Sequence, residues 1–172
     1  MNSIWDFDER KNYININGYK VINSRESKQS SKLLELIDIL IKKLQFRLLL
    51  SEEARNDIYL KLLAETPHKV QEIQLPKDQG TVIFDGLNKP KIVRETGNVN
   101  IGKDKKYRAK YRIIFLTLKY KNGKIKTLNK VIPLVAHELT HTALNHVSWK
   151  DDNHSNLFYK YNKLILRYLK QI

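Results

Sequence analysis

Apolar residues recur at helical spacing in four parts of the chain. The first pattern follows a polar stretch over residues 1–30 and predicts a long helix that Ser30 or Ser31 caps. The apolar face of this helix comprises Leu33, Leu36, Ile37, Leu40, Ile41, Leu44 and Leu48.

Three more helices follow from spacing and capping signals. Ser51, which precedes two glutamates, predicts the start of a second helix that ends near residue 64, because acidic residues favour the first turn. A third helix is predicted over 130–145, with Pro133 tolerated in its first turn. The last is predicted over 155–172.

The middle of the chain changes to the patterns of strands. Residues 81–84 and 111–118 are rich in β-branched and aromatic side chains, and a short strand is also expected around 19–22. Asn122-Gly123 is a favoured pair for a tight hairpin turn, after which 124–128 is expected to return as a partner strand.

The order of these elements is helix, helix, small antiparallel sheet, helix, helix. This order predicts an α+β fold in which the sheet packs against helices. A length of 172 residues suits one domain over 1–172, and residues 1–18 are expected to be a loosely ordered segment.

Composition narrows the class of protein. The absence of cysteine excludes a disulfide scaffold, a cysteine-type zinc finger and a thiol nucleophile. An apolar content of 41% excludes wholesale disorder. No run approaches the ~20 apolar residues that span a bilayer, and the first residues do not resemble a secretory signal. We therefore expect an intracellular protein, in the cytoplasm or nucleus, with no membrane partner.

The predicted third helix carries the motif HExxH, with His137, Glu138 and His141. Residues four apart lie on one face of a helix, so both imidazoles can bind one metal ion. Glu138 is then placed to take a proton from a metal-bound water. The alternative is a buried helix whose histidines only form hydrogen bonds within a core. Burial of these polar side chains is costly unless a metal or another partner satisfies them.

A catalytic zinc needs a third protein ligand and an open fourth position. His146 can serve only if the helix ends by Asn145, because on a continuous helix it lies opposite His137. His154 begins the last helix, and Phe158 four residues later is expected to pack inward, so His154 is the preferred ligand.

Other polar residues near the motif receive more modest assignments. Asp151 and Asp152 are expected to be helix caps, with a role as partner of a ligand, or as the ligand itself, as the alternatives. The remaining histidine, His68, is expected on the surface, and residues 88–91 are a candidate loop near the site.

The chain resembles the WLM metalloproteases and their SprT/Spartan relatives. The resemblance rests on HExxH over 137–141 and on His-x-x-x-Phe over 154–158. The segment 97–103 before a long strand and hairpin, and Asn23-Ser24-Arg25 before the first helix, are similar too. His154 follows His141 by 13 positions, which is closer to the SprT spacing than to the WLM spacing.

The resemblance implies a zincin-like fold of the minimal gluzincin or SprT type. It implies a zinc-dependent endopeptidase that degrades proteins trapped on DNA and is stimulated by DNA. His137, His141 and His154 correspond to the Zn²⁺ ligands, and Glu138 corresponds to the general base.

Two other functions remain open at this point. One is a basic nucleic-acid-binding domain with a structural metal, which four protein ligands would enclose. The other is a zinc hydrolase or protease unrelated to DNA. For a protease, the strand over 111–118 is a candidate edge that holds an extended peptide or protein substrate.

The net charge of +14 is concentrated in one segment. Residues 103–130 contain eleven Lys and Arg against Asp104 alone, which amounts to +10. This clustering predicts DNA binding beside the metal site. The candidate DNA contacts are Lys103, Lys105, Lys106, Arg108, Lys110, Arg112, Lys119, Lys121, Lys124 and Lys126, and Lys130 belongs to the same segment.

Overall fold

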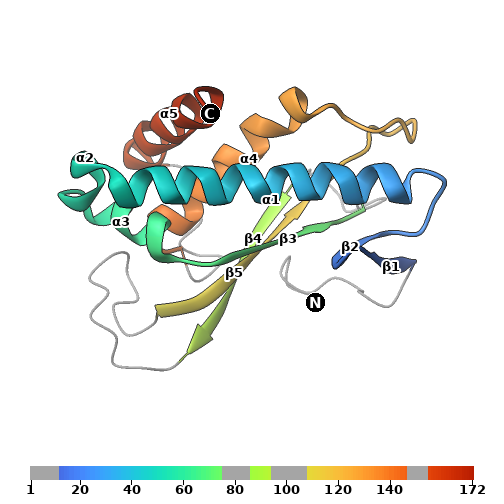
Figure 1. The fold of residues 1–172 in the computed structure, drawn as a ribbon, viewed down its shortest axis with the longest axis horizontal. Helices are drawn as coiled ribbons and strands as arrows, with labels where there is room; N and C mark the ends of the chain where they lie inside the picture. The colour runs from blue at the N-terminus through green and yellow to red at the C-terminus, as the bar shows by residue number, and fades with distance from the viewer. Residues whose placement is uncertain (1–11, 75–85, 94–107, 147–154) are drawn as a thin grey trace.

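One long helix and a three-stranded sheet organise the fold (Figure 1). A computed structural model describes residues 12–74, 86–93, 108–146 and 155–172. The elements, in chain order, are β1 (Tyr13–Ile16), β2 (Tyr19–Ile22), α1 (Ser27–Leu50), α2 (Glu52–Arg55), α3 (Ile58–Glu65), β3 (His68–Glu72), β4 (Gly86–Val93), β5 (Arg108–Leu116), α4 (Leu128–Ala143) and α5 (Asn156–Lys170). The predicted α+β class is confirmed.

The sheet has the order β3-β5-β4, so β5 is its central strand. β4 and β5 are antiparallel, although the sequence predicted a loop over 88–91, and β1 and β2 form a separate antiparallel pair. β3 runs parallel to β5, which the sequence analysis did not predict. The expectation that residues 111–118 form an edge for substrate is wrong, because β5 is paired on both sides. The strand expected over 81–84 lies outside the described residues.

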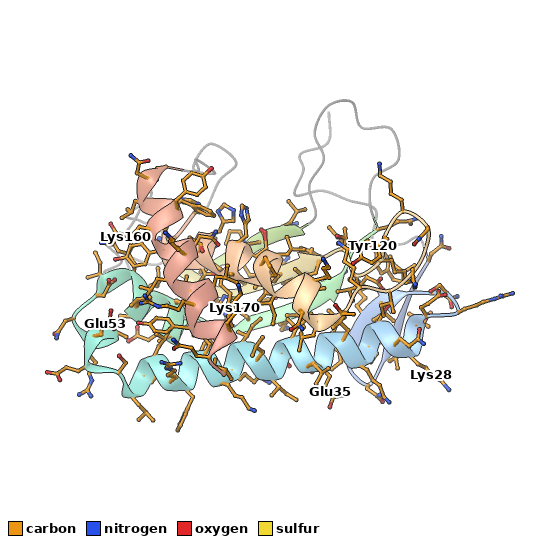
Figure 2. The ribbon with its side chains drawn as sticks, turned by 90° about the horizontal axis from the view of Figure 1, so that it is seen from above. Lys28, Glu35, Glu53, Tyr120, Lys160 and Lys170 are labelled. Atoms are coloured by element: carbon orange, nitrogen blue, oxygen red, sulfur yellow. The ribbon has the colours of Figure 1, made fainter. Side chains whose placement is uncertain are left out.

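Helices α1 and α4 cover one face of the sheet. Inward residues alternate along β5, and Ile114 and Leu116 join the main core together with side chains of both helices. On the other face Phe115 packs with Ile73 and Leu87 in a smaller cluster. The outer flank of α1, with Lys28 and Glu35, points away from the rest of the molecule (Figure 2).

Helix α1 begins earlier than its predicted serine cap. Ser27 Oγ lies 2.8 Å from the Ile22 carbonyl oxygen, and Ser31 Oγ donates to the Ile16 carbonyl at 3.0 Å. These serines therefore attach α1 to the β1–β2 pair. Leu36 was expected on the apolar face but is 50% exposed. The strand β1 also orders part of the segment expected to be loose.

The predicted second helix is two helices, α2 and α3. Ser51 caps α2 as expected, by accepting a hydrogen bond from the Ala54 N–H at 3.4 Å. Asp57 then starts α3, because its carboxylate accepts from the N–H groups of Tyr59 and Leu60. Asp57 was the capping signal that the sequence analysis missed.

The hairpin before α4 confirms the predicted turn. Gly123 has φ +83°, and its N–H donates to the Tyr120 carbonyl at 2.9 Å. The expected partner strand over 124–128 is limited to one bridge, between Lys119 and Ile125. Because α4 begins at Leu128, Pro133 lies in its second turn, at an exposed position, and not in its first turn.

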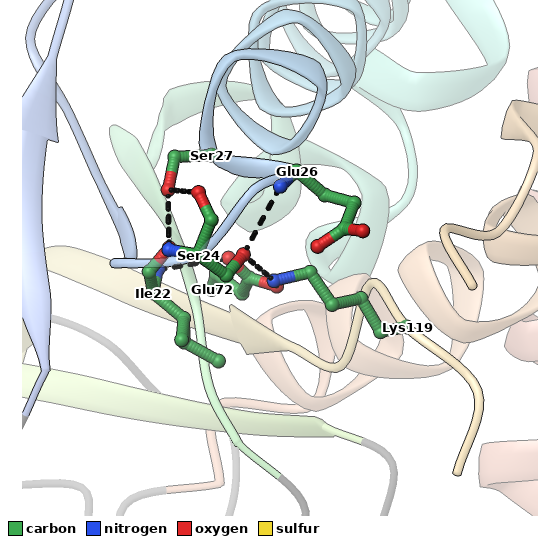
Figure 3. Close-up of polar contacts among 6 residues, drawn as sticks. All are labelled: Ile22, Ser24, Glu26, Ser27, Glu72 and Lys119. Atoms are coloured by element: carbon green, nitrogen blue, oxygen red, sulfur yellow. Dashed lines mark hydrogen bonds and ion pairs between the residues drawn. The ribbon is translucent and has the colours of Figure 1, made fainter. Parts of the chain in front are cut away.

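Glu72 ties the β1–β2 pair to the sheet (Figure 3). Its buried carboxylate accepts a hydrogen bond from the Ile22 N–H at 2.9 Å and lies 3.7 Å from Lys119 Nζ. Lys119 Nζ also donates to Ser24 Oγ at 2.7 Å. Burial raises the pKa of Glu72, so the fold favours the neutral form of this side chain.

We predict that Glu72→Ala destabilises the protein by about 1–3 kcal/mol, because it leaves the Ile22 N–H without its acceptor. Glu72→Gln keeps an acceptor at that position and cannot carry a buried charge. Its free energy of unfolding at pH 7, measured in urea, is therefore expected to lie near or above that of the unmodified protein. Equal losses in the two variants would contradict this account.

Candidate metal centre

The C-terminal half of α4 brings together two imidazoles and one carboxylate. Ligand atoms of His137, Glu138 and His141 lie within 4.8 Å of one another. Glu138 is 2% exposed and His141 is 6% exposed, so the group is largely enclosed. The structure thus confirms the clustering of these three residues that their helical spacing predicts.

Helix α5 closes one side of this group. Ser155 caps α5 by accepting a hydrogen bond from the Phe158 N–H at 3.3 Å. The buried Phe158 ring lies 5.0 Å from the His137 ring and 4.8 Å from the His141 ring, between centroids. The prediction that Phe158 packs inward is confirmed.

Helix α4 ends in a Schellman motif that redirects the chain. Asn145 adopts φ +54° and its N–H donates to the Thr142 carbonyl, while the His146 N–H donates to the His141 carbonyl at 3.0 Å. The helix therefore ends before Asn145, which was the condition for His146 to approach the site. His146 Nδ1 lies 2.8 Å from His141 Nδ1.

The preferred third ligand, His154, lies outside the described residues, as do Asp151 and Asp152. Among the described residues, the group within metal-binding distance consists of His137, Glu138 and His141. His146 contacts this group through His141 and is not part of it.

A buried polar network supports the same stretch of α4 from the sheet. Asn88 Nδ2 on β4 donates to the Glu138 carbonyl at 2.6 Å and lies 2.8 Å from Thr142 Oγ1. Arg112 on β5 donates to Asn88 Oδ1 at 3.0 Å and to Asn145 Oδ1 at 3.4 Å. Asn88 thus holds the helix backbone at Glu138, and Arg112 connects Asn88 with the residue that follows the C-cap of the helix.

The predicted positions of three residues in this region are wrong. Arg112 was a candidate DNA contact, but it is 1% exposed, and burial lowers its pKa to about 9. Asn88 belongs to β4 and not to a loop. His68 is buried and not on the surface, with Nε2 2.8 Å from Thr142 Oγ1. A signal for Arg112 was available, because it shares the inward alternation of Ile114 and Leu116.

Close approach of β4 also shapes the site. A Cβ atom at Gly86 would lie 2.9 Å from the Phe115 carbonyl oxygen and 3.3 Å from Glu138 Cγ. Only glycine permits this packing without a shift of the strand or of the helix. The sequence alone offered no sign of this contact.

The predicted basic surface is divided. Lys110 is exposed near the start of β5, whereas Lys121 and Lys124 are exposed on the hairpin after its end, with about 20 Å of strand between them. Lys119 is bonded to Ser24, and Lys126 Nζ donates to Thr117 Oγ1 at 3.1 Å. Lys130 is exposed on α4. Lys103, Lys105, Lys106 and the side chain of Arg108 lie outside the described residues.

The donor set fits zinc. Imidazole nitrogen and carboxylate oxygen are ligands that Zn²⁺ accepts, whereas Ca²⁺ and Mg²⁺ require sites dominated by oxygen. The group lies on one helix, and Phe158 packs against its His141 ring.

No protein family, curated protein or solved structure matches the chain. The resemblance to WLM and SprT proteases therefore rests on the motif residues alone. Among the described residues, no helix is both long enough and apolar enough to cross a membrane.

We predict a pH dependence of stability that originates at His68. Burial first, and the charge of Arg112 second, lower the pKa of His68 from 6.5 to about 3. The neutral ring stabilises the fold above pH 6.5. That contribution is lost as pH falls from 6.5 towards 3, because the unfolded chain then binds the proton, at up to about 1.4 kcal/mol per pH unit.

Urea unfolding between pH 7 and pH 4 checks this dependence. His68→Gln keeps a donor and an acceptor but does not titrate, so its stability is expected to fall less steeply than that of the unmodified protein. Parallel curves for the two proteins would contradict the assignment.

Proposed function

We propose that the protein is a zinc-dependent endopeptidase with a zincin-like fold. The observation that carries this proposal is the group of His137, Glu138 and His141 on one buried helix, with ligand atoms within 4.8 Å of one another. This arrangement supplies two imidazole nitrogens and one carboxylate in the pattern that metal-assisted hydrolysis requires.

His137 and His141 would hold the ion, with His154 as the proposed third ligand. A zinc ion bound there supplies a Lewis acid that lowers the pKa of a coordinated water to ~7 and polarises the scissile carbonyl. Three protein ligands would hold the ion in this proposal, which distinguishes it from a structural zinc with four protein ligands.

Glu138 is proposed to move the proton. Its carboxylate accepts a proton from the attacking water and delivers it to the nitrogen of the leaving amine. The Glu138 side chain is buried, and Asn88 donates a hydrogen bond to the Glu138 backbone carbonyl. These two features hold the base of the side chain in place. The buried ring of Phe158 packs against both neighbouring imidazoles.

Proteins associated with DNA, including crosslinked ones, are the proposed substrates. The support is the net charge of +14 and the exposure of Lys110, Lys121 and Lys124. Neutralising these lysines is expected to weaken DNA binding without loss of the metal, because none of them belongs to the metal-binding group.

We predict that Glu138→Gln retains zinc and lowers the rate of peptide cleavage by at least about 100-fold, because the amide cannot accept the proton. Fluorescein-labelled casein is a suitable substrate, and metal content is measured on the same samples. Glu35→Gln, on the exposed flank of α1, is the matched control. Undiminished cleavage by Glu138→Gln would contradict the mechanism.

The same assay separates the remaining functions. A protein crosslinked to single-stranded or double-stranded DNA is compared with the same protein without DNA. Faster cleavage of the crosslinked protein supports the DNA-associated role, and equal rates indicate a protease unrelated to DNA. Bound zinc without any cleavage indicates the structural-metal alternative.

A further inference from the structure

His146 makes a contact that the proposed mechanism does not use. Its Nδ1 lies 2.8 Å from Nδ1 of His141, and the two ring centroids are 5.0 Å apart. Two ring nitrogens at this distance form a hydrogen bond only when one carries a proton and the other accepts it.

The direction of this bond decides which nitrogen of His141 faces a metal. A ring nitrogen must be unprotonated to bind zinc, and the other nitrogen then carries the hydrogen. If Nδ1–H of His141 donates to His146, then Nε2 of His141 is the atom for the ion. His146 is not in the group of residues whose ligand atoms lie within 4.8 Å of one another, so its contact is made from outside that group.

The fold holds His146 in this place by several independent contacts. Asn145 takes the left-handed conformation that turns the chain, and Arg112 donates to its side-chain oxygen at 3.4 Å. The His146 backbone N–H is bonded to the His141 carbonyl. The His146 ring lies nearly parallel to the ring of Phe158, at an interplanar angle of 8° and a centroid distance of 6.3 Å.

We propose that His146 is a positioning residue for the metal site. It accepts a hydrogen bond from Nδ1–H of His141 and thereby presents Nε2 of His141 to the zinc ion. This inference rests on the proposed metal site. It gives His146 a role different from that of a third ligand, which remains assigned to His154.

Three substitutions of His146 separate positioning from ligation and from packing. In His146→Asn, the side-chain oxygen occupies the δ position of the imidazole, so it can accept the same hydrogen bond, but it is a poor zinc ligand. His146→Phe keeps a ring against Phe158 and has no acceptor. His146→Ala removes both the ring and the acceptor.

Zinc affinity is measured by competition with a chelator. We expect His146→Ala and His146→Phe to bind zinc about 10–100-fold more weakly, because partners that orient a ligand contribute that much, and His146→Asn to recover most of the affinity. Equal losses in all three variants would show that His146 is itself a ligand, and unchanged affinity in His146→Ala would show that it has no role. Either result overturns the proposal.

A second readout does not require metal. Nitrogen-15 NMR of the metal-free protein at a pH where the rings are neutral reports which nitrogen of His141 carries the hydrogen. We expect it on Nδ1 in the unmodified protein and in His146→Asn, and on Nε2 in His146→Ala. Hydrogen on Nε2 in the unmodified protein would overturn the positioning role. Failure of the unmodified protein to bind zinc would instead overturn the proposed function.

Discussion

The enclosure of polar groups on α4 is the constraint on which the rest of the structure depends. Glu138 and His141 are almost fully buried on a helix whose other buried residues are apolar except for Thr140 and Thr142. Such groups are stable in an interior only when each finds a partner. The strands hold this helix through Asn88, which donates to the Glu138 carbonyl, and through Arg112, which donates to the side chain of Asn145 just after the helix.

The same contacts connect the sheet with the chemistry of the site. Arg112 lies in the central strand, so its position is fixed by pairing with β3 and β4 on either side. From there its guanidinium reaches both Asn88 and the residue that ends α4. Phe158 of α5 packs against both imidazoles. Strands and helices therefore fix the geometry together.

Sequence patterns predicted what depends on neighbours along the chain. The HExxH helix, its spacing and the inward Phe158 followed from helical periodicity alone. The strand β4 was missed because Pro90 and polar residues mask its pattern, although proline is tolerated on an edge strand. His68 and Arg112 were placed on the surface, because their buried partners Thr142 and Asn145 are distant in sequence. Helix α1 begins earlier than predicted, and Ser31, the expected cap, instead donates a hydrogen bond to a carbonyl of β1.

Anomalous diffraction at the zinc absorption edge, from crystals grown with one equivalent of zinc, tests the central claim most directly. The account predicts one anomalous peak at about 2.0–2.1 Å from a ring nitrogen of both His137 and His141. It also predicts that the contact to His141 is made through Nε2. A zinc ion bound elsewhere, with no peak between these two imidazoles, would contradict the assignment of α4 as a metal-binding helix.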